Sequence, residues 1–279
     1  MTTRFNTISF LSDLGVADES VGVVHSVIRT IAPDARTIDI THGITPHDVR
    51  AGSLCLARAV QYVAPGVVLA VIDPTVGTAR RAIAVEVGDG AGVLVGPDNG
   101  LLASAVAMTG GATRAIELTN VEYHLGALGQ TFSCRDVFAP VAAHLCNGIV
   151  LTEIGTEIDP LSLMPGLMPL ARSRDATLIA EVLWVDHFGN AQLNIGTDDL
   201  EGLLGGDPTA RVRMDFTAGG RVGFRMAGIK DTFANIASSD AGLISDSYGL
   251  LSICLNQRSA ADELGIHVGT EITLSALTA

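Results

Sequence analysis

The stretch TISFLSDLGVADESVGVVHSVIRTI, residues 7–31, decides the fold class. It begins with an apolar run of strand length that ends in the turn sequence of residues 12–15. From Ser20 onward, apolar residues recur at three- and four-residue steps, which is the spacing of an amphipathic helix. The stretch therefore predicts a strand followed by a helix, the opening of a β-α-β unit.

The same alternation continues along the first half of the chain. A second strand is predicted at 37–40, a helix at 47–63, and a buried strand at 67–72, where the apolar run is continuous. Such a succession predicts right-handed crossovers and a mostly parallel sheet. Further strands are expected at 82–87 and 93–95, and further helices at 100–108 and 138–145.

The pattern changes after Pro165 and Pro169. Successive strand-like runs with few helices between them predict a small antiparallel β-barrel. These runs cover residues 178–185, 191–195, 211–216, 222–226, 249–255 and 270–274. We therefore expect an α/β protein with two domains, an α/β domain over residues 1–170 and a β-barrel domain over residues 171–279.

Composition excludes several classes of protein. Hydrophobic residues make up 48% of the 279 residues and charged residues 17%, so the chain can bury a core. Acidic residues outnumber basic ones by 30 to 17, giving a formal net charge of −13. This charge disfavours binding to nucleic acid or to anionic membranes, because both repel an acidic surface.

Cysteine usage and the apolar runs bear on the cell compartment. The four cysteines are far apart and form no CxxC pair, so neither a zinc ribbon nor a disulfide framework is indicated. No run reaches the ~18 apolar residues of a membrane span, and the first residues do not resemble a secretion signal. We expect a soluble, cytoplasmic protein.

Three aspartates stand directly after predicted strands: Asp13, Asp39 and Asp73. Loops at the carboxyl ends of parallel strands form the ligand crevice of such sheets. An aspartate at a strand–helix junction can equally be a helix cap, worth ~1 kcal/mol. Taken singly, each of the three admits both interpretations.

Several longer strings are more specific than a cap. They are FLSDLG (10–15), IDITHGITPHDV (38–49), VIDPTVGTARR (71–81), GPDNGLL (96–102), TFSCRDVFAP (131–140), VDHFGN (185–190) and SYGLL (247–251). In this order they resemble the S-adenosyl-L-methionine (SAM) hydroxide adenosyltransferase family, which is related to fluorinase and chlorinase. The resemblance extends over almost the whole chain.

The resemblance implies a fold, a reaction and an assembly. The fold would be an N-terminal α/β domain with a C-terminal β-barrel, and the assembly a homotrimer that binds SAM at the subunit interface. In the reaction, water or hydroxide attacks C5′ of SAM and releases adenosine and L-methionine. SAM is the substrate, and neither a metal nor a cofactor is implied.

The chemistry of this substrate explains which residues such a site needs. A sulfonium leaves as a neutral thioether, so the enzyme need not protonate it. It must instead align the nucleophile, C5′ and sulfur, and such alignment can contribute ~7–11 kcal/mol. The resemblance implies that Asp13 accepts hydrogen bonds from both ribose hydroxyls, which one carboxylate can do.

The resemblance also assigns the remaining site residues. Asp73 and Arg80 would hold the attacking water, with Ser133 as a third member. Asp186 would pair with the substrate ammonium, Ser247 would donate to its carboxylate, and Phe188 and Asn190 would contact the adenine. The other implied substrate-binding residues are Asp18, Ser20, His47, Phe132, Cys134, Tyr248 and Gln257.

Some of these residues have simpler structural interpretations. Asp186 suits the start of a hairpin, Ser20 suits a helix N-terminus, and Phe188 suits a barrel core. His47 suits a solvated helix start. The other histidines show no metal-ligand spacing such as HExxH, so we interpret them as packing or surface residues.

The third catalytic position departs from the family pattern. Where the family has Phe-His-Gly-Arg-Asp, this chain has Phe132-Ser133-Cys134-Arg135-Asp136. Serine is no base near neutral pH, so a proton acceptor worth typically ~10²–10⁴ in rate is missing. Cys134 presents a thiol, although buried cysteine is usually inert.

Two other functions are compatible with the departure at Ser133. One is a 5′-halogenating transferase, which the Asp73 carboxylate disfavours, because a halide ~4 Å away would be repelled by ~4 kcal/mol at an effective dielectric of 20. The other is a SAM- or adenosine-binding protein with weakened catalysis.

Overall fold

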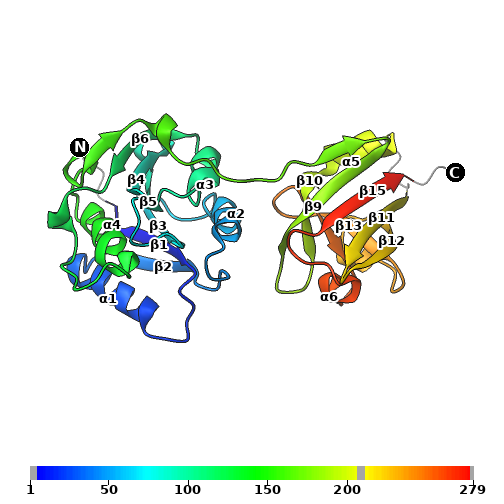
Figure 1. Ribbon diagram of the computed structural model, residues 1–279, viewed down its shortest axis with the longest axis horizontal. Coiled ribbons are helices and arrows are strands. Elements are labelled where there is room, and N and C mark those ends of the chain that lie inside the picture. The colour runs from blue at the N-terminus through cyan, green and yellow to red at the C-terminus, as the bar shows by residue number, and fades with distance from the viewer. Residues whose placement is uncertain (1–4, 206–210, 277–279) are drawn as a thin grey trace. The chain divides into compact units, whose positions relative to one another are not determined.

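The computed structural model describes residues 5–205 and 211–276 (Figure 1). The chain divides into two compact units, Met1–Leu167 and Met168–Ala279. The strands of the first unit are β1 (Thr7–Ser12), β2 (Arg36–Thr41), β3 (Val67–Val71), β4 (Ala82–Val87), β5 (Gly92–Pro97), β6 (Ala112–Glu117) and β7 (Thr156–Ile158). Its α-helices are α1 (Ser20–Ile31), α2 (Val49–Ala59), α3 (Ala103–Met108) and α4 (Ala139–Cys146).

The sheet of the first unit has the order β2-β1-β3-β5-β4-β6-β7. Strands β2, β1, β3 and β5 are parallel, as the β-α-β alternation predicted. From β5 outward the pairings are antiparallel, so the sheet is mixed. The connection at residues 88–91 is too short for a crossover helix, so β4 and β5 are antiparallel, and β6 and β7 extend the sheet beyond β4 with antiparallel pairings. The α/β class is confirmed.

Helices cover both faces of this sheet. Figure 1 shows α1 and α4 on one side and α2 and α3 on the other. The main core lies between the sheet and the first pair, where α4 contacts both β1 and β3. Phe10 and Phe138 are fully buried there. The central strands are therefore held from both sides, which fixes the loops that follow them.

Helix α2 begins two residues later than the predicted start at residue 47. Asp48 is its N-cap, with a side chain that accepts a hydrogen bond from the Ala51 N–H at 2.8 Å. His47 has a φ of +70°, outside the helical region. It is the last loop residue before the N-cap and its side chain is exposed, so it is a solvated residue next to the helix start and not part of the first helical turn.

The second unit is a β-barrel. Its strands are β8 (Arg172–Arg174), β9 (Thr177–Val185), β10 (Ala191–Gly196), β11 (Arg211–Ala218), β12 (Arg221–Ile229), β13 (Ala241–Ser245), β14 (Leu250–Cys254) and β15 (Glu271–Ala276). Two short helices accompany them, α5 (Thr197–Leu204) and α6 (Ala260–Leu264). The order β10-β14-β13-β12-β11-β15-β9 closes because β9 also pairs with β10.

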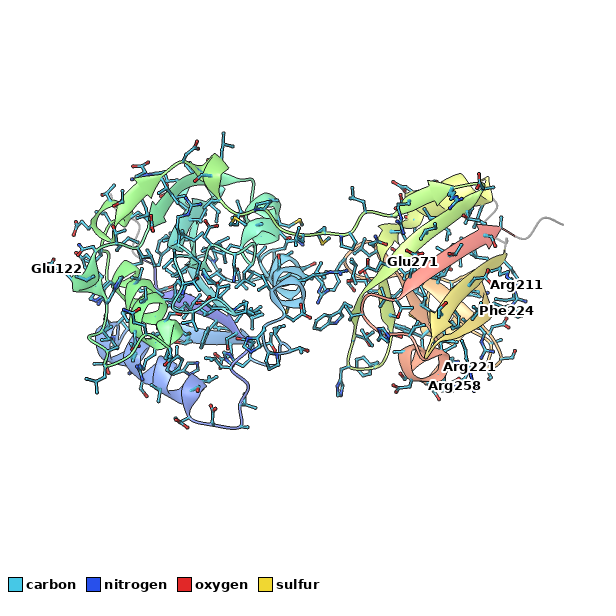
Figure 2. All side chains as sticks on the ribbon, in the orientation of Figure 1. Glu122, Arg211, Arg221, Phe224, Arg258 and Glu271 are labelled. Carbon is cyan, nitrogen blue, oxygen red and sulfur yellow. The ribbon has the colours of Figure 1, made fainter. Side chains whose placement is uncertain are left out.

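The barrel confirms the predicted architecture. The pairings are antiparallel except for β12 with β13, and β8 adds to the beginning of β9. Along β11, Val212, Met214 and Phe216 point into the core, as period-two alternation requires. Arg211 and Phe224 lie on the outer side of β11 and β12 (Figure 2).

The structure also shows the state of the cysteines and the character of the helices. All four cysteines are free thiols. No helix within residues 5–205 and 211–276 combines the length and the apolar character that a membrane crossing needs.

Candidate functional site

The first cluster of predicted residues lies at the carboxyl edge of the parallel strands. β1 and β3 are neighbours, and Ser12 pairs with Val71, so the loops carrying Asp13 and Asp73 leave the sheet at the same edge. The Asp13 Oδ2 accepts a hydrogen bond from the His47 N–H at 2.8 Å. The contact with Asp13 thus comes from the His47 backbone, while the His47 side chain is exposed.

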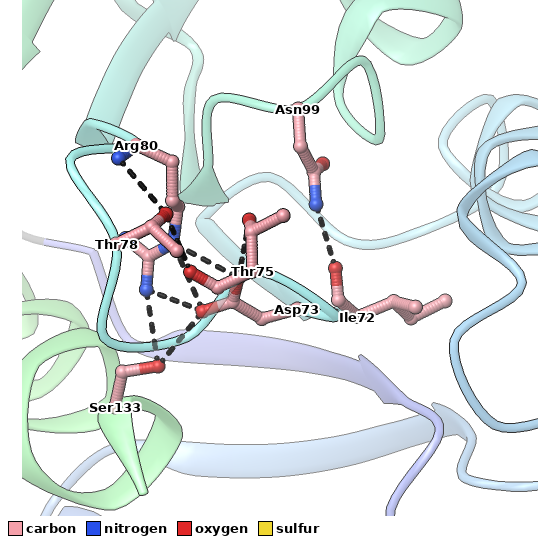
Figure 3. A network of polar contacts seen from close by, with 7 residues as sticks. All are labelled: Ile72, Asp73, Thr75, Thr78, Arg80, Asn99 and Ser133. Carbon is pink, nitrogen blue, oxygen red and sulfur yellow. Dashed lines mark hydrogen bonds and ion pairs between the residues drawn. The ribbon is translucent and has the colours of Figure 1, made fainter. Parts of the chain in front are cut away.

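Asp73 is the centre of a polar network (Figure 3). The Arg80 Nε donates to both Asp73 carboxylate oxygens at 2.9 Å, and the Arg80 Nη2 donates to Oδ2 as well. The Ser133 hydroxyl donates to Oδ2 at 3.1 Å, and the Thr75 hydroxyl donates to Oδ1 at 3.2 Å. The structure therefore brings all three predicted catalytic residues together.

Arg80 is itself held in place. Its Nη2 donates to the Ser133 Oγ at 3.2 Å, and its guanidinium carbon lies 5.1 Å from the centre of the Phe138 ring. The adjacent Arg81 points elsewhere and binds Asp98, with an Nε–Oδ2 distance of 2.8 Å. Side chains of neighbouring extended residues face opposite ways, which separates the two arginines.

Ser133 stands directly before a π-helical turn, Cys134–Phe138, that leads into α4. Such turns are uncommon and occur often at functional sites. The Cys134 thiol is buried, and its pKa is raised first by this burial and then by the negative charges of Asp13 and Asp73. The thiol is protonated and inert near neutral pH, so it is no nucleophile.

The carboxylates of Asp13 and Asp73 both act on the Cys134 thiol, so the segment after Phe132 lies near the carboxyl edge of β1 and β3. Phe132 is partly buried against the core of the first unit, and the Arg135 guanidinium carbon lies 5.0 Å from its ring centre. Phe132 thus supports the segment that presents Ser133.

A pocket of about 330 Å³ opens beside this network, lined by Ser133, Arg80, Thr78 and His124 among others. The His124 Nε2 is buried and forms no hydrogen bond, and burial lowers the pKa of the ring. Neither Thr78 nor His124 stands at a position that the sequence marks as a site residue. His124 has no informative spacing from any other ligand-type residue, and only the fold brings it to Ser133.

Asp18 and Ser20 form a local pair. The Asp18 Oδ1 accepts a hydrogen bond from the Ser20 N–H at 2.9 Å, and this bond lowers the pKa of the exposed Asp18 carboxyl. Ser20 is the first residue of α1. Asp18 thus binds the first backbone N–H of α1, and Ser20 is a residue of the helix N-terminus, as its simpler structural interpretation predicted.

In the second unit, Asp186 organises the turn between β9 and β10. Its Oδ1 accepts hydrogen bonds from the Phe188 N–H and the Asn190 N–H, both at 2.9 Å. Its Oδ2 accepts from the Asn190 Nδ2 at 2.8 Å. The carboxylate is therefore engaged by its own turn, and Phe188 is 76% exposed, so the interpretation of Phe188 as barrel core is wrong.

Three predicted residues share a pocket in the barrel unit. Phe188, Asn190 and Gln257 line a cavity of about 640 Å³. Gly189 has a φ of +82°, and a Cβ built there would lie 2.0 Å from the Ser259 Oγ. Only glycine lets the two walls approach this closely. Lining residues that the sequence analysis did not assign are Phe233, Ala234, Leu255, Asn256, Arg258 and Ser259.

Ser247 and Tyr248 lie on the turn between β13 and β14. The Tyr248 N–H donates to the Asp246 Oδ1 at 2.8 Å. Among the residues that the structure describes, neither of the two belongs to the lining of the Phe188 pocket. Asp246 also accepts from Gln192 of β10, at an Nε2–Oδ2 distance of 2.5 Å, and this bond ties the turn to the barrel wall.

Comparison with known proteins identifies the family. Residues 8–155 match the model of the SAM hydroxide adenosyltransferase N-terminal domain, and residues 180–273 match that of the C-terminal domain. A protein named (R)-S-adenosyl-L-methionine hydrolase from Salinispora tropica is 42% identical over 96% of this chain and 97% of its own. A protein named Fluorinase from Actinoplanes sp. is 28% identical over 96% and 97%.

A solved structure is similar throughout. It is an uncharacterized conserved protein from Thermotoga maritima, 33% identical, with a TM-score of 0.84 over 96% of this chain and 99% of that one. Both domain models match in the order of the two units seen here. The chain therefore belongs to the SAM hydroxide adenosyltransferase family, as its motifs predicted.

Proposed function

We propose that this protein hydrolyses SAM to adenosine and L-methionine by attack of water at C5′. The observation that carries the proposal is the Asp73–Arg80–Ser133 network, a charged and oriented set of groups at the carboxyl edge of the sheet. Support also comes from a relative named for this hydrolysis that is more similar to the chain than the protein named Fluorinase.

The network suits a reaction that depends on alignment. The Asp73 side chain is 6% exposed and that of Arg80 is 13% exposed, so both are shielded from bulk water. Two-point contact with Arg80 fixes the plane of the carboxylate. A nucleophile held by such a rigid group keeps its direction toward C5′, which is the main requirement for displacing a sulfonium.

The hydrogen bonds define a proton path. Asp73 already accepts bonds on both oxygens from Arg80, Ser133 and Thr75, and a carboxylate offers about four lone-pair directions. The Ser133 Oγ accepts one bond and donates one, so it has a lone pair left for a water. In this path the water proton passes to the Ser133 Oγ as the serine proton passes to Asp73, which ends protonated.

Substrate contacts complete the proposal. Asp13 would hold the ribose hydroxyls, and Phe188 with Asn190 would contact the adenine in the barrel pocket. Asp186 would pair with the substrate ammonium, although its oxygens also hold the turn. We include no metal or cofactor in the reaction.

A product assay tests the reaction. Purified protein is incubated with SAM in chloride buffer and in chloride-free buffer, and products are separated by chromatography. Adenosine and methionine in equal amounts in both buffers support the proposal. Accumulation of 5′-chloro-5′-deoxyadenosine in chloride would establish a halogenating transferase, and SAM binding by calorimetry without any adenosine would establish a binding protein.

The proposal extends to the assembly, a cytoplasmic homotrimer with the substrate at the subunit interface. Each unit of the chain carries part of the predicted residues, with Asp73 in the first and Asp186 in the second. Support comes from the resemblance and, for a reducing compartment, from the free cysteines.

Mass measurement in solution tests the trimer, and mixing tests the shared site. Chains carrying Asp73→Ala and chains carrying Asp186→Ala are unfolded and refolded together. If one copy supplies Asp73 and its neighbour supplies Asp186, mixed trimers contain intact sites and recover activity. A mixture as inactive as the two separate variants, despite exchange shown by mass, would contradict a shared site.

A further inference from the structure

Two histidines and an aspartate outside the Asp73 network converge in the first unit. His25 lies on α1, Asp39 on β2, and His42 just after β2. The His25 Nε2 is 2.8 Å from the Asp39 Oδ1, and the His42 Nε2 is 3.1 Å from the same oxygen. One ligand atom from each residue lies within 4.8 Å of the other two.

The His42 ring is oriented by its surroundings. Its Nδ1 is 2.8 Å from the Ser12 Oγ, in a buried hydrogen bond, and its ring packs edge-on to Phe10 at 4.6 Å between centres. This leaves Nε2 aimed at the cluster. Metal-binding histidines characteristically use their second nitrogen in this way, because the bond fixes the ring.

The His42 Nε2 is poorly satisfied by protein groups alone. The side chain is 4% exposed, yet its Nε2 forms no hydrogen bond despite its proximity to Asp39. A buried polar atom without a hydrogen bond destabilises the folded state, because it has given up its bonds to water. The same Asp39 oxygen already takes the bond from His25, so a group that accepts all three electron pairs would remove the conflict.

We propose that His25, Asp39 and His42 form a binding site for a divalent first-row transition metal ion, with Zn²⁺ as the representative. Two imidazole nitrogens and one carboxylate oxygen are ligands that such ions favour over Mg²⁺ or Ca²⁺. His25 and Asp39 are 36% and 42% exposed, so the ion can enter from solvent and keep water as a further ligand.

The site is linked to the loop that carries Asp13. His42 binds the Ser12 side chain through its ring, and its carbonyl accepts the Gly15 N–H at 2.8 Å. Ser12 precedes Asp13 in the sequence and Gly15 follows it, so His42 holds the loop on both sides of Asp13. A bound ion would fix His42 and, through it, this loop, so the metal has a structural role that is separate from the chemistry at Asp73.

Metal uptake by the full chain, without an affinity tag and after chelator treatment, tests the proposal. Zn²⁺ affinity is measured by competition with a chromophoric chelator, and Co²⁺ is added as a spectroscopic probe. We expect one Zn²⁺ per chain, visible-region Co²⁺ bands, and a Tm that rises with Zn²⁺ concentration.

Matched variants locate the site. His25→Gln and Asp39→Asn should each weaken Zn²⁺ binding by at least about tenfold, while His267→Gln, an exposed histidine of the barrel unit, should leave it unchanged. Circular dichroism of the metal-free variants shows that they fold. Folded variants that bind Zn²⁺ as tightly as the parent, or a parent that takes up no Zn²⁺ at one equivalent, would overturn the proposal.

Discussion

Asp73 and Asp186 both stand in motifs of similar specificity, but the structure surrounds them differently. Asp73 is bonded by Thr75 and Arg80, two and seven residues away, and also by Ser133, which is 60 residues away. The partners of Asp186 are two and four residues away, within its own turn. The bond to Ser133 makes Asp73 part of a cluster that the fold assembles, whereas Asp186, bonded within its own turn, has a structural task even without substrate.

The largest effect should come from Asp73→Ala. Removing the carboxylate removes the group that orients the water and receives its proton, so kcat should fall by about 10²–10⁴ with little change in KM. Steady-state kinetics with SAM measures both. Asp89→Asn, at a turn outside the network with a φ of +53°, is the control and should match the parent. Hydrolysis by Asp73→Ala at the parental rate would show that the network is not the water site.

In the barrel unit, the variant Asp186→Asn tests whether the Asp186 carboxylate binds the substrate. Asparagine keeps an oxygen for the Phe188 and Asn190 N–H groups, and its NH2 group can donate to the Asn190 Oδ1 once that amide is flipped. It loses the charge that would pair with the ammonium. We expect KM to rise about ten- to hundredfold, as for a lost charge-assisted hydrogen bond, with Tm nearly unchanged. Asp186→Ala should lower Tm in addition. An unchanged KM in the asparagine variant would show that Asp186 stabilises its turn and does not bind the substrate ammonium.

Ser133→His tests the departure from the family pattern. The adjacent pocket of about 330 Å³ offers space for an imidazole, and a base near Asp73 would take the water proton directly. We expect kcat to rise by about tenfold or more, measured under saturating SAM. Ser133→Ala is the matched variant and should lower kcat, because it breaks the proton path. A histidine variant slower than the alanine variant would contradict this role.

The smallest expected effect concerns pH and the stability of the first unit. Burial lowers the pKa of His124 and of His144, so the unfolded chain binds protons more readily than the folded one. Stability is therefore full above about pH 6.5, the unfolded value, and is lost as the pH falls through the lowered values. We expect a loss of less than about 1 kcal/mol after solvent screening, measured by urea unfolding. His124→Gln with His144→Gln should flatten the profile, and an unchanged profile would contradict the assignment.

Sequence reasoning succeeded where spacing and structure are locally connected. Successive side chains of an extended chain point in opposite directions, which predicted that Arg80 and not Arg81 binds Asp73. The parallel strands predicted that Asp13 and Asp73 lie at one edge of the sheet. Ser133 came only through the family resemblance, because nothing local connects it to Asp73. The convergence of His25 with Asp39 depends on how α1 packs beside β2, which no motif expresses.

The strands that the sequence analysis missed have a physical explanation too. β6 contains Ile116 as its one large apolar residue and β13 is short and contains Gly242, so neither shows a strong apolar period. β7 and β8 have three residues each, too few for any period. Most strands of the sheet and of the barrel were predicted correctly from longer apolar runs, because burial of these residues stabilises the strand conformation. The conformation of His47 was missed because a positive φ at a non-glycine residue has no clear sequence signal.

The close approach of Gly189 to Ser259 has a practical consequence for redesign. At this wall of the barrel pocket the Gly189 backbone packs against Ser259, and a side chain at position 189 would overlap the Ser259 Oγ and Cβ. Under the proposed assignment of this pocket to the adenine, attempts to accept bulkier nucleoside analogues should leave the 186–190 turn untouched and shorten Phe233, another lining residue. The close contact at Gly189 therefore restricts redesign of the pocket to lining residues that project a side chain, such as Phe233.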